Sequence, residues 1–320
     1  MVSIQERIQS VGVVPVISID DPQHALQLGK ALLDGGLPIA EITFRTQAGQ
    51  EAIRLMRDAY PEILVGAGTI ISVEDAKRAQ KAGAQFIVSP GYDDQIVEFC
   101  QDQGLEVFPG VNNPTQIQAA LKRGLSVLKF FPAEASGSLG MLKSLHAPFP
   151  AVKFMPTGGI NLDNLGQYLK LPYIVACGGS WMVPSALMKE GRWEEISALC
   201  KQAVYAVHGF SFAHLGINEK DEKQAQATTR MLSHVLQPMW EKPNSYFSSE
   251  YIEIMKSPNL GTHGHIGIHT YDVPRALKYL SLFGFEPTPG SERRSEQGKL
   301  YFVYLSPEVS GFALHLMNLS

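Results

Sequence analysis

Lys129 lies in the middle of an apolar run of the sequence, VLKFFPA. A lysine buried in such a run is costly to keep as a cation, which favours the free amine. A free amine can attack a ketone to form an imine, and the imine is an electron sink for making or breaking a carbon–carbon bond. The placement of Lys129 therefore predicts Schiff-base chemistry.

Three polar residues at a spacing of two, Glu41, Thr43 and Arg45, belong to a second apolar run. In a strand this spacing puts them on one face. Glu41 can carry a proton, and Arg45 can bind a substrate carboxylate with two parallel hydrogen bonds. The spacing also allows a purely structural ion pair between Glu41 and Arg45, and Lys129 could simply neutralise a glutamate.

Two glycine pairs suggest a binding site for an anion. Thr157 precedes Gly158 and Gly159, and Ser180 follows Gly178 and Gly179. Glycines at strand ends let backbone N–H groups approach a phosphate, helped by the following helix N-terminus. The two pairs together indicate a phosphorylated or otherwise anionic substrate.

The elements that must position these residues recur regularly along the first two thirds of the chain. Short apolar runs rich in β-branched residues alternate with amphipathic stretches, and the runs cover residues 12–17, 38–43, 63–68, 85–89, 105–109, 126–131, 152–157 and 173–178. Their continuous apolar character is typical of strands covered on both faces. Capping residues such as Ser72, Asn113 and Asn161 predict helices between them.

Eight strand–helix units predict a (β/α)8 TIM barrel over residues 1–207. A doubly wound open sheet is the alternative, but the first strand–helix junction lacks the glycine fingerprint of a dinucleotide-binding version. Function in such a barrel gathers where the strands end, and Lys129 and Glu41 lie there. Lys153 is a rival amine, but it lies four residues before Thr157 and so nearer the bottom of the barrel.

The last third of the chain contains an internal repeat of about 50 residues. The segment HLGI at 214–217 matches HIGI at 265–268, and IEIM at 252–255 matches LHLM at 314–317. Each copy begins with a strand-like run and continues with a helix, over about 219–236 in the first and 273–283 in the second. Residues 208–320 are therefore expected to form one smaller α+β domain of two similar halves.

The first 207 residues resemble the bacterial 2-keto-3-deoxy-6-phosphogluconate (KDPG) / 4-hydroxy-2-oxoglutarate (KHG) aldolases. The segments that carry this resemblance are VVPVI, EITFRT, VGAGT, FIVSPG, PGV, KFFPAE, PTGGI and GGSWMVP. It implies a class I, metal-free aldolase without a cofactor, usually a homotrimer, that releases pyruvate from a 2-keto-4-hydroxy acid. Family members differ in which 2-keto acid they prefer.

The same resemblance assigns roles to individual residues. Lys129 would form the Schiff base, and Glu41 would be the general acid/base. Arg45 and Thr69 would hold the keto-acid carboxylate, and Pro90 and Phe131 would line the pocket. The far, often phosphorylated end of the substrate would meet Thr157, Gly158, Gly159, Gly179 and Ser180.

Residues 208–320 resemble a glyoxalase-like (vicinal oxygen chelate) domain of two βαβββ halves. Family members hold a metal by residues on the first and last strands of each half, which here are His214, Glu253, His265 and His315. Three imidazoles and one carboxylate suit a divalent transition metal. His315 departs from the family, which often has a carboxylate there, and we expect His234, His263 and His269 to be bystanders.

Two further functions stay open from the sequence. A phosphosugar isomerase or epimerase would use Glu41 as its base and Lys129 as an electrostatic stabiliser. Alternatively, the distinctive activity of the chain could lie in the C-terminal domain, as a metal-dependent enzyme or as a structural, regulatory or assembly module.

The composition limits the partners and the compartment. The 320 residues carry a net charge of −4 with no cluster of Lys and Arg, so neither nucleic acid nor a membrane surface is expected as a partner. No run is long enough to span a bilayer, and the N-terminal apolar run is too short for a signal peptide. Cys100, Cys177 and Cys200 form no CxxC motif, which favours reduced thiols in the cytoplasm. The expected ligand is a small 2-keto acid.

Overall fold

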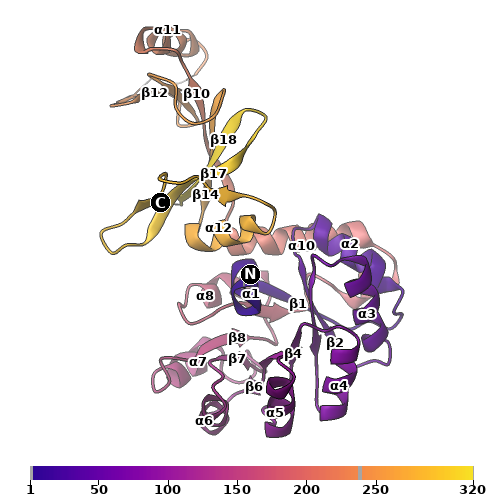
Figure 1. Cartoon of the computed structure of the whole chain (residues 1–320). Coiled ribbons are helices and arrows are strands. Elements are labelled where there is room, and N and C mark those ends of the chain that lie inside the picture. The colour runs from indigo at the N-terminus through magenta and orange to yellow at the C-terminus, as the bar shows by residue number, and fades with distance from the viewer. Residues whose placement is uncertain (1–2, 237–239, 320) are drawn as a thin grey trace. The chain divides into compact units, whose positions relative to one another are not determined.

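The computed structural model describes residues 3–236 and 240–319. The chain folds into two compact units, Met1–Val207 and His208–Ser320 (Figure 1). None of the described helices combines the length and apolar character that a membrane span requires. All three cysteines are buried, and burial raises the pKa of Cys100 and Cys200 to about 12.

The strands of the first unit are parallel and form two sheets. One has the order β5-β4-β3-β2-β1-β9 and the other the order β6-β7-β8. The strands are β1 (Val13–Ile17), β2 (Ile39–Thr43), β3 (Leu64–Gly68), β4 (Phe86–Val88), β5 (Glu106–Phe108), β6 (Gly110–Val111), β7 (Val127–Phe130), β8 (Lys153–Pro156) and β9 (Cys177–Gly179).

The two sheets close into one barrel. Only Pro109 separates β5 from β6, and a proline has no N–H to give to a ladder, so these two strands are one interrupted fifth strand. On the other side, bridges between Phe154 and Ile174 and between Thr157 and Gly178 join β8 to the β9 segment. The predicted (β/α)8 barrel is therefore confirmed.

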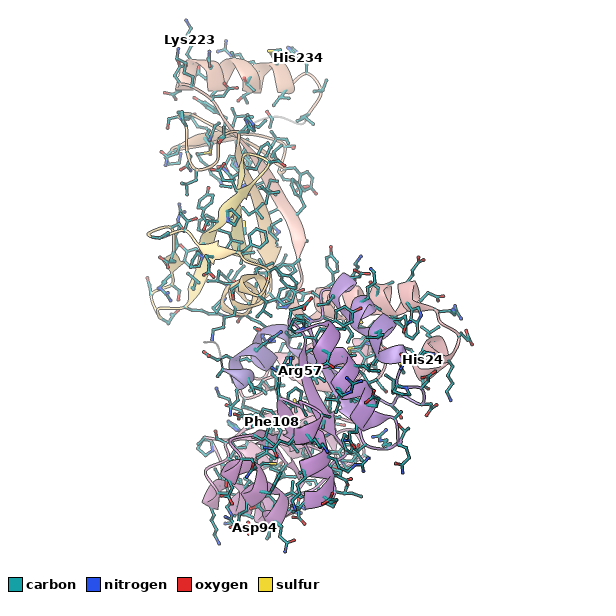
Figure 2. The ribbon with its side chains drawn as sticks, turned by 45° about the vertical axis from the view of Figure 1, so that its right-hand side comes forward. His24, Arg57, Asp94, Phe108, Lys223 and His234 are labelled. Carbon is teal, nitrogen blue, oxygen red and sulfur yellow. The ribbon has the colours of Figure 1, made fainter. Side chains whose placement is uncertain are left out.

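Helices surround these strands (Figure 1), while Phe108 lies buried among them and Asp94 lies on an outer helix (Figure 2). Ser72, Asn113 and Asn161 cap their helices as predicted, each accepting a bond from a first-turn N–H. The helices are α1 (Ile4–Val11), α2 (His24–Asp34), α3 (Gly49–Ala59), α4 (Val73–Lys81), α5 (Asp94–Asp102), α6 (Pro114–Lys122), α7 (Ser138–His146), α8 (Leu162–Leu169), α9 (Ser185–Lys189) and α10 (Trp193–His208).

The second unit is built on one sheet with the order β11-β12-β13-β10-β14-β18-β17-β15, and β16 pairs with β17. Its elements are β10 (Ser211–Asn218), α11 (Glu222–Leu232), β11 (Trp240–Lys242), β12 (Ser245–Ser248), β13 (Ile252–Met255), β14 (Gly264–Thr270), α12 (Val273–Ser281), β15 (Glu286–Pro287), β16 (Arg293–Arg294), β17 (Leu300–Val309) and β18 (Phe312–Asn318). The short strand β16 lies within the turn-rich stretch 290–299.

The two halves of this unit are arranged alike. Strands β10 and β14 pair antiparallel at the centre, and each pairs in parallel with the last strand of its own half, β13 or β18. Helix α11, which Figure 2 shows between Lys223 and His234, packs on Tyr246 and Ile254, and α12 packs on Val303 and Leu316. Because side chains alternate along a strand, the neighbours of these apolar residues lie on the opposite face of the sheet.

Candidate active site and candidate metal centre

The central feature of the barrel is a buried pair of charged side chains. Lys129 lies on β7 and is only 5% exposed, and its Nζ is 3.3 Å from Oε1 of Glu41, which lies on β2. Gly68, on the neighbouring strand β3, makes room for this carboxylate. A Cβ at position 68 would lie 2.2 Å from Oε1 of Glu41, so a larger residue there would displace it.

The second carboxylate oxygen of Glu41 is the atom of this pair that could interact with a substrate. Oε2 is buried and has no hydrogen-bond partner among the described residues. Burying an unpaired carboxylate oxygen is costly, and a substrate hydroxyl or a water molecule would satisfy it. The pair is the geometry that an imine-forming amine and its proton carrier require. The same geometry would also suit a purely electrostatic pair. The ion-pair partner of Glu41 is Lys129 and not Arg45, which the sequence spacing had also allowed.

A cavity of about 520 Å³ opens at the ends of the barrel strands. It adjoins the charged pair through Phe131, whose ring centroid lies 5.2 Å from Nζ of Lys129. Many of the residues predicted to bind substrate line it: Arg45, Phe131, Thr157, Gly158, Gly159, Gly179 and Ser180.

The backbone conformation and the close packing at this cavity require glycine at these positions. Gly158 and Gly159 have φ values of 98° and 82°, in the left-handed region that L side chains rarely adopt. A Cβ on Gly179 would lie 1.9 Å from the ring of Trp181. The glycines therefore keep the backbone close to the cavity, as an anion-binding strand end needs.

Arg45 reaches the cavity from a turn and not from a strand. The prediction that it shares one strand face with Glu41 and Thr43 is therefore wrong. Strand β2 ends at Thr43, whose hydroxyl donates to the carbonyl oxygen of Ile17 at 2.9 Å. Arg45 lies in the turn before α3 and is exposed. The turn therefore positions the side chain of Arg45, while the hydrogen bond from Thr43 joins β2 to β1.

Thr69 and Pro90 follow β3 and β4 but are not among the described residues that line the cavity. Thr69 has a φ of 58°, which is unusual for a β-branched residue and typical of functional positions that hold strain. Gly110 lets the chain approach Pro90, because a Cβ there would lie 2.1 Å from the Pro90 carbonyl oxygen.

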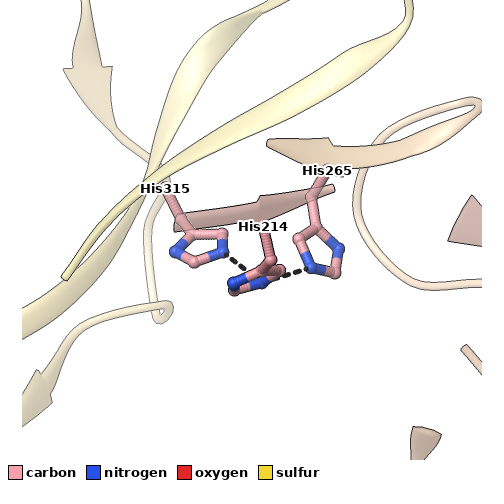
Figure 3. A group of neighbouring side chains, drawn as sticks. All are labelled: His214, His265 and His315. Atoms are coloured by element: carbon pink, nitrogen blue, oxygen red, sulfur yellow. Dashed lines mark hydrogen bonds between the residues drawn. The ribbon is translucent and has the colours of Figure 1, made fainter. Parts of the chain in front are cut away.

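A second cluster, shown in Figure 3, lies in the C-terminal unit. Alternation along the strands puts it on the sheet face opposite α11 and α12. The side chains of His214, His265 and His315 point toward one another, with Nε2 of His214 at 3.2 Å from Nε2 of each of the other two. Oε2 of Glu253 lies 3.1 Å from Nε2 of His265 and 3.2 Å from Nε2 of His214. His214 therefore contacts each of the other three residues predicted as metal ligands, and Glu253 contacts His214 and His265.

Strand register brings these four residues together. Gly216 pairs with both His265 and Glu253, and Gly267 pairs with both His214 and His315. A Cβ on Gly216 would lie 2.0 Å from the His265 ring, and one on Gly267 would lie 2.8 Å from the His214 ring. The glycine of each repeat thus makes room for the histidine of the other repeat.

The protonation states of Glu253 and His315 suit a metal. Burial raises the pKa of Glu253, but hydrogen bonds with His214, His265 and Ser245 outweigh it and hold that pKa far below its usual range. Burial, with neighbouring His214 and His265, lowers the pKa of His315 to about 2, so its imidazole is neutral at physiological pH. A carboxylate and neutral imidazoles are the forms that bind metal ions.

The spacing of the donors can be compared with metal geometry. Ligands at roughly 2.0–2.1 Å from Zn²⁺ stand roughly 3.4 Å apart in a tetrahedron and roughly 3.0 Å apart when adjacent in an octahedron. The contacts of 3.1–3.2 Å fall between these values. Nε2 of His214 lies within 3.2 Å of each of the other three donor atoms, and the donor atoms of the three histidines lie within 4.8 Å of one another, so the histidines can converge on one divalent ion with Glu253 beside them.

Comparison with known proteins decides the family. The model of the family described as "KDPG and KHG aldolase" matches residues 4–199. The chain belongs to the KDPG and KHG aldolase family. It is 44% identical over 207 residues to the 2-dehydro-3-deoxy-phosphogluconate aldolase of Treponema pallidum (strain Nichols), an alignment that covers 65% of this chain and 99% of that protein.

Solved structures of the aldolase family agree with the fold. The KDPG aldolase of Legionella pneumophila, captured with pyruvate as a covalent carbinolamine intermediate, is 37% identical with a TM-score of 0.61. The match covers 63% of this chain and 98% of that one. The enzyme of Zymomonas mobilis ZM4 with 3-phosphoglycerate is also 37% identical, with a TM-score of 0.59, over 64% of this chain and 96% of that one.

Several side chains of this aldolase-family barrel can now be assigned to the site or away from it. The rival amine Lys153 is the exposed first residue of β8, at the opposite end of the strand from Thr157. Glu134 is exposed and accepts a hydrogen bond from the Tyr168 hydroxyl. Ser18, which directly follows β1, lines the cavity but was missed from the sequence, although its place after a strand could have revealed it.

Two more lining residues, Trp181 and Ser185, were also missed. Nε1 of Trp181 is buried without a hydrogen-bond partner among the described residues. No sequence spacing marks these two, because their approach to the cavity depends on how the chain turns after β9. In the C-terminal unit, the group of convergent histidines in the described chain does not include His234, His263 or His269.

Proposed function

We propose that residues 1–207 are a class I aldolase domain that reversibly cleaves a 2-keto-4-hydroxy acid, such as KDPG or KHG, to pyruvate and an aldehyde. The observation that carries this proposal is the buried amine of Lys129 beside Glu41, in a chain of this family. A related structure holds pyruvate as a covalent carbinolamine, which is the chemistry proposed for Lys129.

The reaction can be followed atom by atom. The Lys129 amine adds to the C2 ketone and loses water to give the imine. Glu41, through a water molecule, takes the proton of the C4 hydroxyl, the C3–C4 bond breaks, and its electron pair moves into an enamine as the aldehyde leaves. Protonation at C3 and hydrolysis of the imine release pyruvate and restore the amine.

Binding roles are proposed for the remaining site residues. Arg45 and Thr69 hold the carboxylate beside the imine, and Pro90 and Phe131 wall the apolar side. The other end of the substrate, phosphorylated in KDPG, meets Thr157, Gly158, Gly159, Gly179 and Ser180. Most of these residues share one cavity, and the left-handed glycines give backbone N–H groups access to it.

Reductive trapping tests the proposal. Borohydride added with pyruvate should fix an adduct on the peptide that contains Lys129, and Lys153→Ala should trap as well as the unchanged protein. A panel of phosphorylated and unphosphorylated 2-keto acids then defines the substrate by pyruvate release. Turnover without any adduct, with activity surviving in Lys129→Arg, would instead support the isomerase or epimerase alternative.

For residues 208–320 we propose a glyoxalase-like domain that holds a divalent transition metal through His214, Glu253, His265 and His315. The support is the convergence of four donor atoms from equivalent strands of two similar halves. Metal analysis of the intact protein should find one equivalent, which His265→Ala loses. Chelation should leave pyruvate release unchanged. Protein that takes up no Zn²⁺, Co²⁺ or Mn²⁺ would refute the site.

We further propose that the chain works as a cytoplasmic homotrimer. The family resemblance supports the trimer, and three buried cysteines without a CxxC motif suit a reducing compartment. Light scattering coupled to gel filtration tests the assembly, and fractionation of the source cells tests the compartment.

A further inference from the structure

Two neighbouring loops carry the two ends of the substrate site proposed for the barrel. The loop after β7 begins with Phe131, whose ring adjoins the amine of Lys129. The loop after β8, called here the glycine loop, contains Gly158 and Gly159, which line the cavity at the proposed anion end. Glu134 joins these two loops, although the mechanism proposed above gives it no part.

Glu134 contacts the glycine loop through both its backbone and its side chain. Its N–H donates to the carbonyl oxygen of Gly158 at 3.1 Å, and the preceding N–H, of Ala133, donates to that of Thr157 at 2.8 Å. A Cβ on Gly159 would lie 2.5 Å from Cγ and 2.7 Å from Cβ of Glu134. The Glu134 side chain is therefore packed directly against the backbone of Gly159.

One face of α8 holds both partners of this contact. Asn164 and Tyr168 are four residues apart on α8, so they lie on the same face of the helix. Nδ2 of Asn164 donates to the carbonyl oxygen of Gly159 at 3.1 Å, and the Tyr168 hydroxyl donates to Oε1 of Glu134. Tyr168 is only 1% exposed. Its burial and this hydrogen bond raise the pKa of Tyr168, so the phenol stays protonated and remains the donor.

The bond from Tyr168 is not needed to satisfy the carboxylate. Glu134 is exposed, and water alone could solvate it. What the buried hydroxyl adds is a fixed position for the Glu134 side chain, and therefore for the backbone of Gly159 that packs against it. Groups held in place before a ligand arrives bind it at a lower cost in entropy.

We propose that Glu134, held by Tyr168, is a positioning residue that fixes the glycine loop at the distance from Lys129 required by the anionic far end of the substrate. This inference rests on the aldolase function proposed above. Both KDPG and KHG end in an anionic group on the side away from the ketone. The bond between Glu134 and Tyr168 would therefore act on binding of that group and not on imine formation.

Tyr168→Phe is the first test, because it removes only the hydroxyl. Water can take its place at the exposed Glu134, so the variant should fold. The assay uses KDPG or KHG, whichever the unchanged protein cleaves better. We expect KM to rise about tenfold and kcat to change by less than about twofold, as for a lost interaction that serves the ground state and the transition state alike.

Pyruvate separates positioning of the far end from a merely structural role, because it occupies only the Lys129 end of the site. The pyruvate concentration that gives half-maximal borohydride trapping should be the same in Tyr168→Phe as in the unchanged protein. Tyr173→Phe is the matched control, since the Tyr173 hydroxyl is buried without a hydrogen-bond partner among the described residues. It should change neither KM nor trapping.

Variants of the carboxylate check the same contact from its other side. Glu134→Gln keeps a side chain that can accept from the Tyr168 hydroxyl, and its KM should stay close to that of the unchanged protein. Glu134→Ala loses both the acceptor and the packing on Gly159, and its KM should rise at least as far as in Tyr168→Phe.

The positioning role and the aldolase function can fail separately. If the unchanged protein traps pyruvate and cleaves its substrate, but Tyr168→Phe or Glu134→Ala keeps the original KM, the positioning role is refuted and the function stands. Equal losses of trapping and cleavage in Tyr168→Phe would also overturn it, because α8 would then support the whole site and not its far end. If the unchanged protein neither traps pyruvate nor cleaves any substrate, the function falls and this inference falls with it.

Discussion

The barrel and the C-terminal unit bury their polar groups in different arrangements. The barrel site is one amine and one carboxylate, with Oε2 of Glu41 left without a partner in the described structure. The C-terminal cluster instead gathers four donor atoms from strands related by an internal repeat. A covalent catalyst needs one reactive atom and a partner that moves its proton, whereas a metal centre needs several donors that converge on one point.

Removing the nucleophile should have the largest effect and should affect only one of the two regions. Lys129→Ala is expected to lower pyruvate release by at least about 10³-fold, because no amine remains to form the imine. Metal content of the C-terminal unit should stay the same. Steady-state assays with metal analysis check both results, and Lys153→Ala, at the exposed start of β8, should keep full activity. Substantial turnover in Lys129→Ala would contradict the barrel mechanism.

Both regions depend on a glycine opposite a functional side chain, which allows a paired test. Gly68→Ala would push against Oε1 of Glu41, and Gly216→Ala would push against the His265 ring. A misplacement of about 1 Å can cost about 100-fold, so we expect kcat to fall by that order in the first variant and metal affinity to fall in the second. Each variant should spare the other region.

Gly166→Ala is the control for this pair, since a Cβ there meets no atom within 4 Å. It should change neither the rate nor the metal affinity. Equal losses of pyruvate release in Gly68→Ala and Gly216→Ala would show that the two regions are not chemically separate.

A smaller effect should follow from loosening a ligand without removing it. Ser245→Ala deletes the hydroxyl that donates to Oε1 of Glu253. Loss of such a supporting hydrogen bond typically costs between about 10- and 100-fold in metal affinity. Competition with a coloured chelator measures it, and Ser295→Ala in the same unit should behave like the unchanged protein. An unchanged affinity would mean that Ser245 does not orient the carboxylate.

His208 allows the effect of burial on the pKa of a histidine to be measured apart from metal binding. This buried imidazole lies outside the cluster, with its ring centroid 4.9 Å from that of Phe210 and 4.4 Å from that of Tyr279. Burial, with a smaller contribution from Arg275, lowers the pKa of His208 to about 3. Below pH 6.5 the unfolded chain therefore binds a proton that the folded chain does not, and stability falls with pH until about pH 3.

Between pH 7 and pH 5 this proton should lower the free energy of unfolding by about 2 kcal/mol. His208→Phe removes the titrating group, so the loss over this interval should shrink by about that amount. Urea unfolding of metal-free protein at the two pH values measures the difference. The same loss in both proteins would show that His208 does not contribute.

The barrel could be predicted from the sequence because its signals are local. Continuous apolar runs mark strands covered on both faces, and Ser72, Asn113 and Asn161 mark helix starts through hydrogen bonds within one turn. The break at Pro109 and the turn that carries Arg45 off the strand were not predicted. Both depend on how neighbouring strands pair, which is not a property of either segment alone.

The sequence alone determined which residues are able to do chemistry: an amine in an apolar strand, and histidines followed two residues later by a glycine in two copies of a repeat. Only the tertiary structure decided which of them meet. It placed Glu41 against Lys129 across 88 positions of sequence, left Thr69 and Pro90 outside the described cavity lining, and brought His214 and His315 to 3.2 Å. Residue type is a property of each position in the sequence, whereas the distance between residues on different strands is fixed only when the whole sheet or barrel has formed.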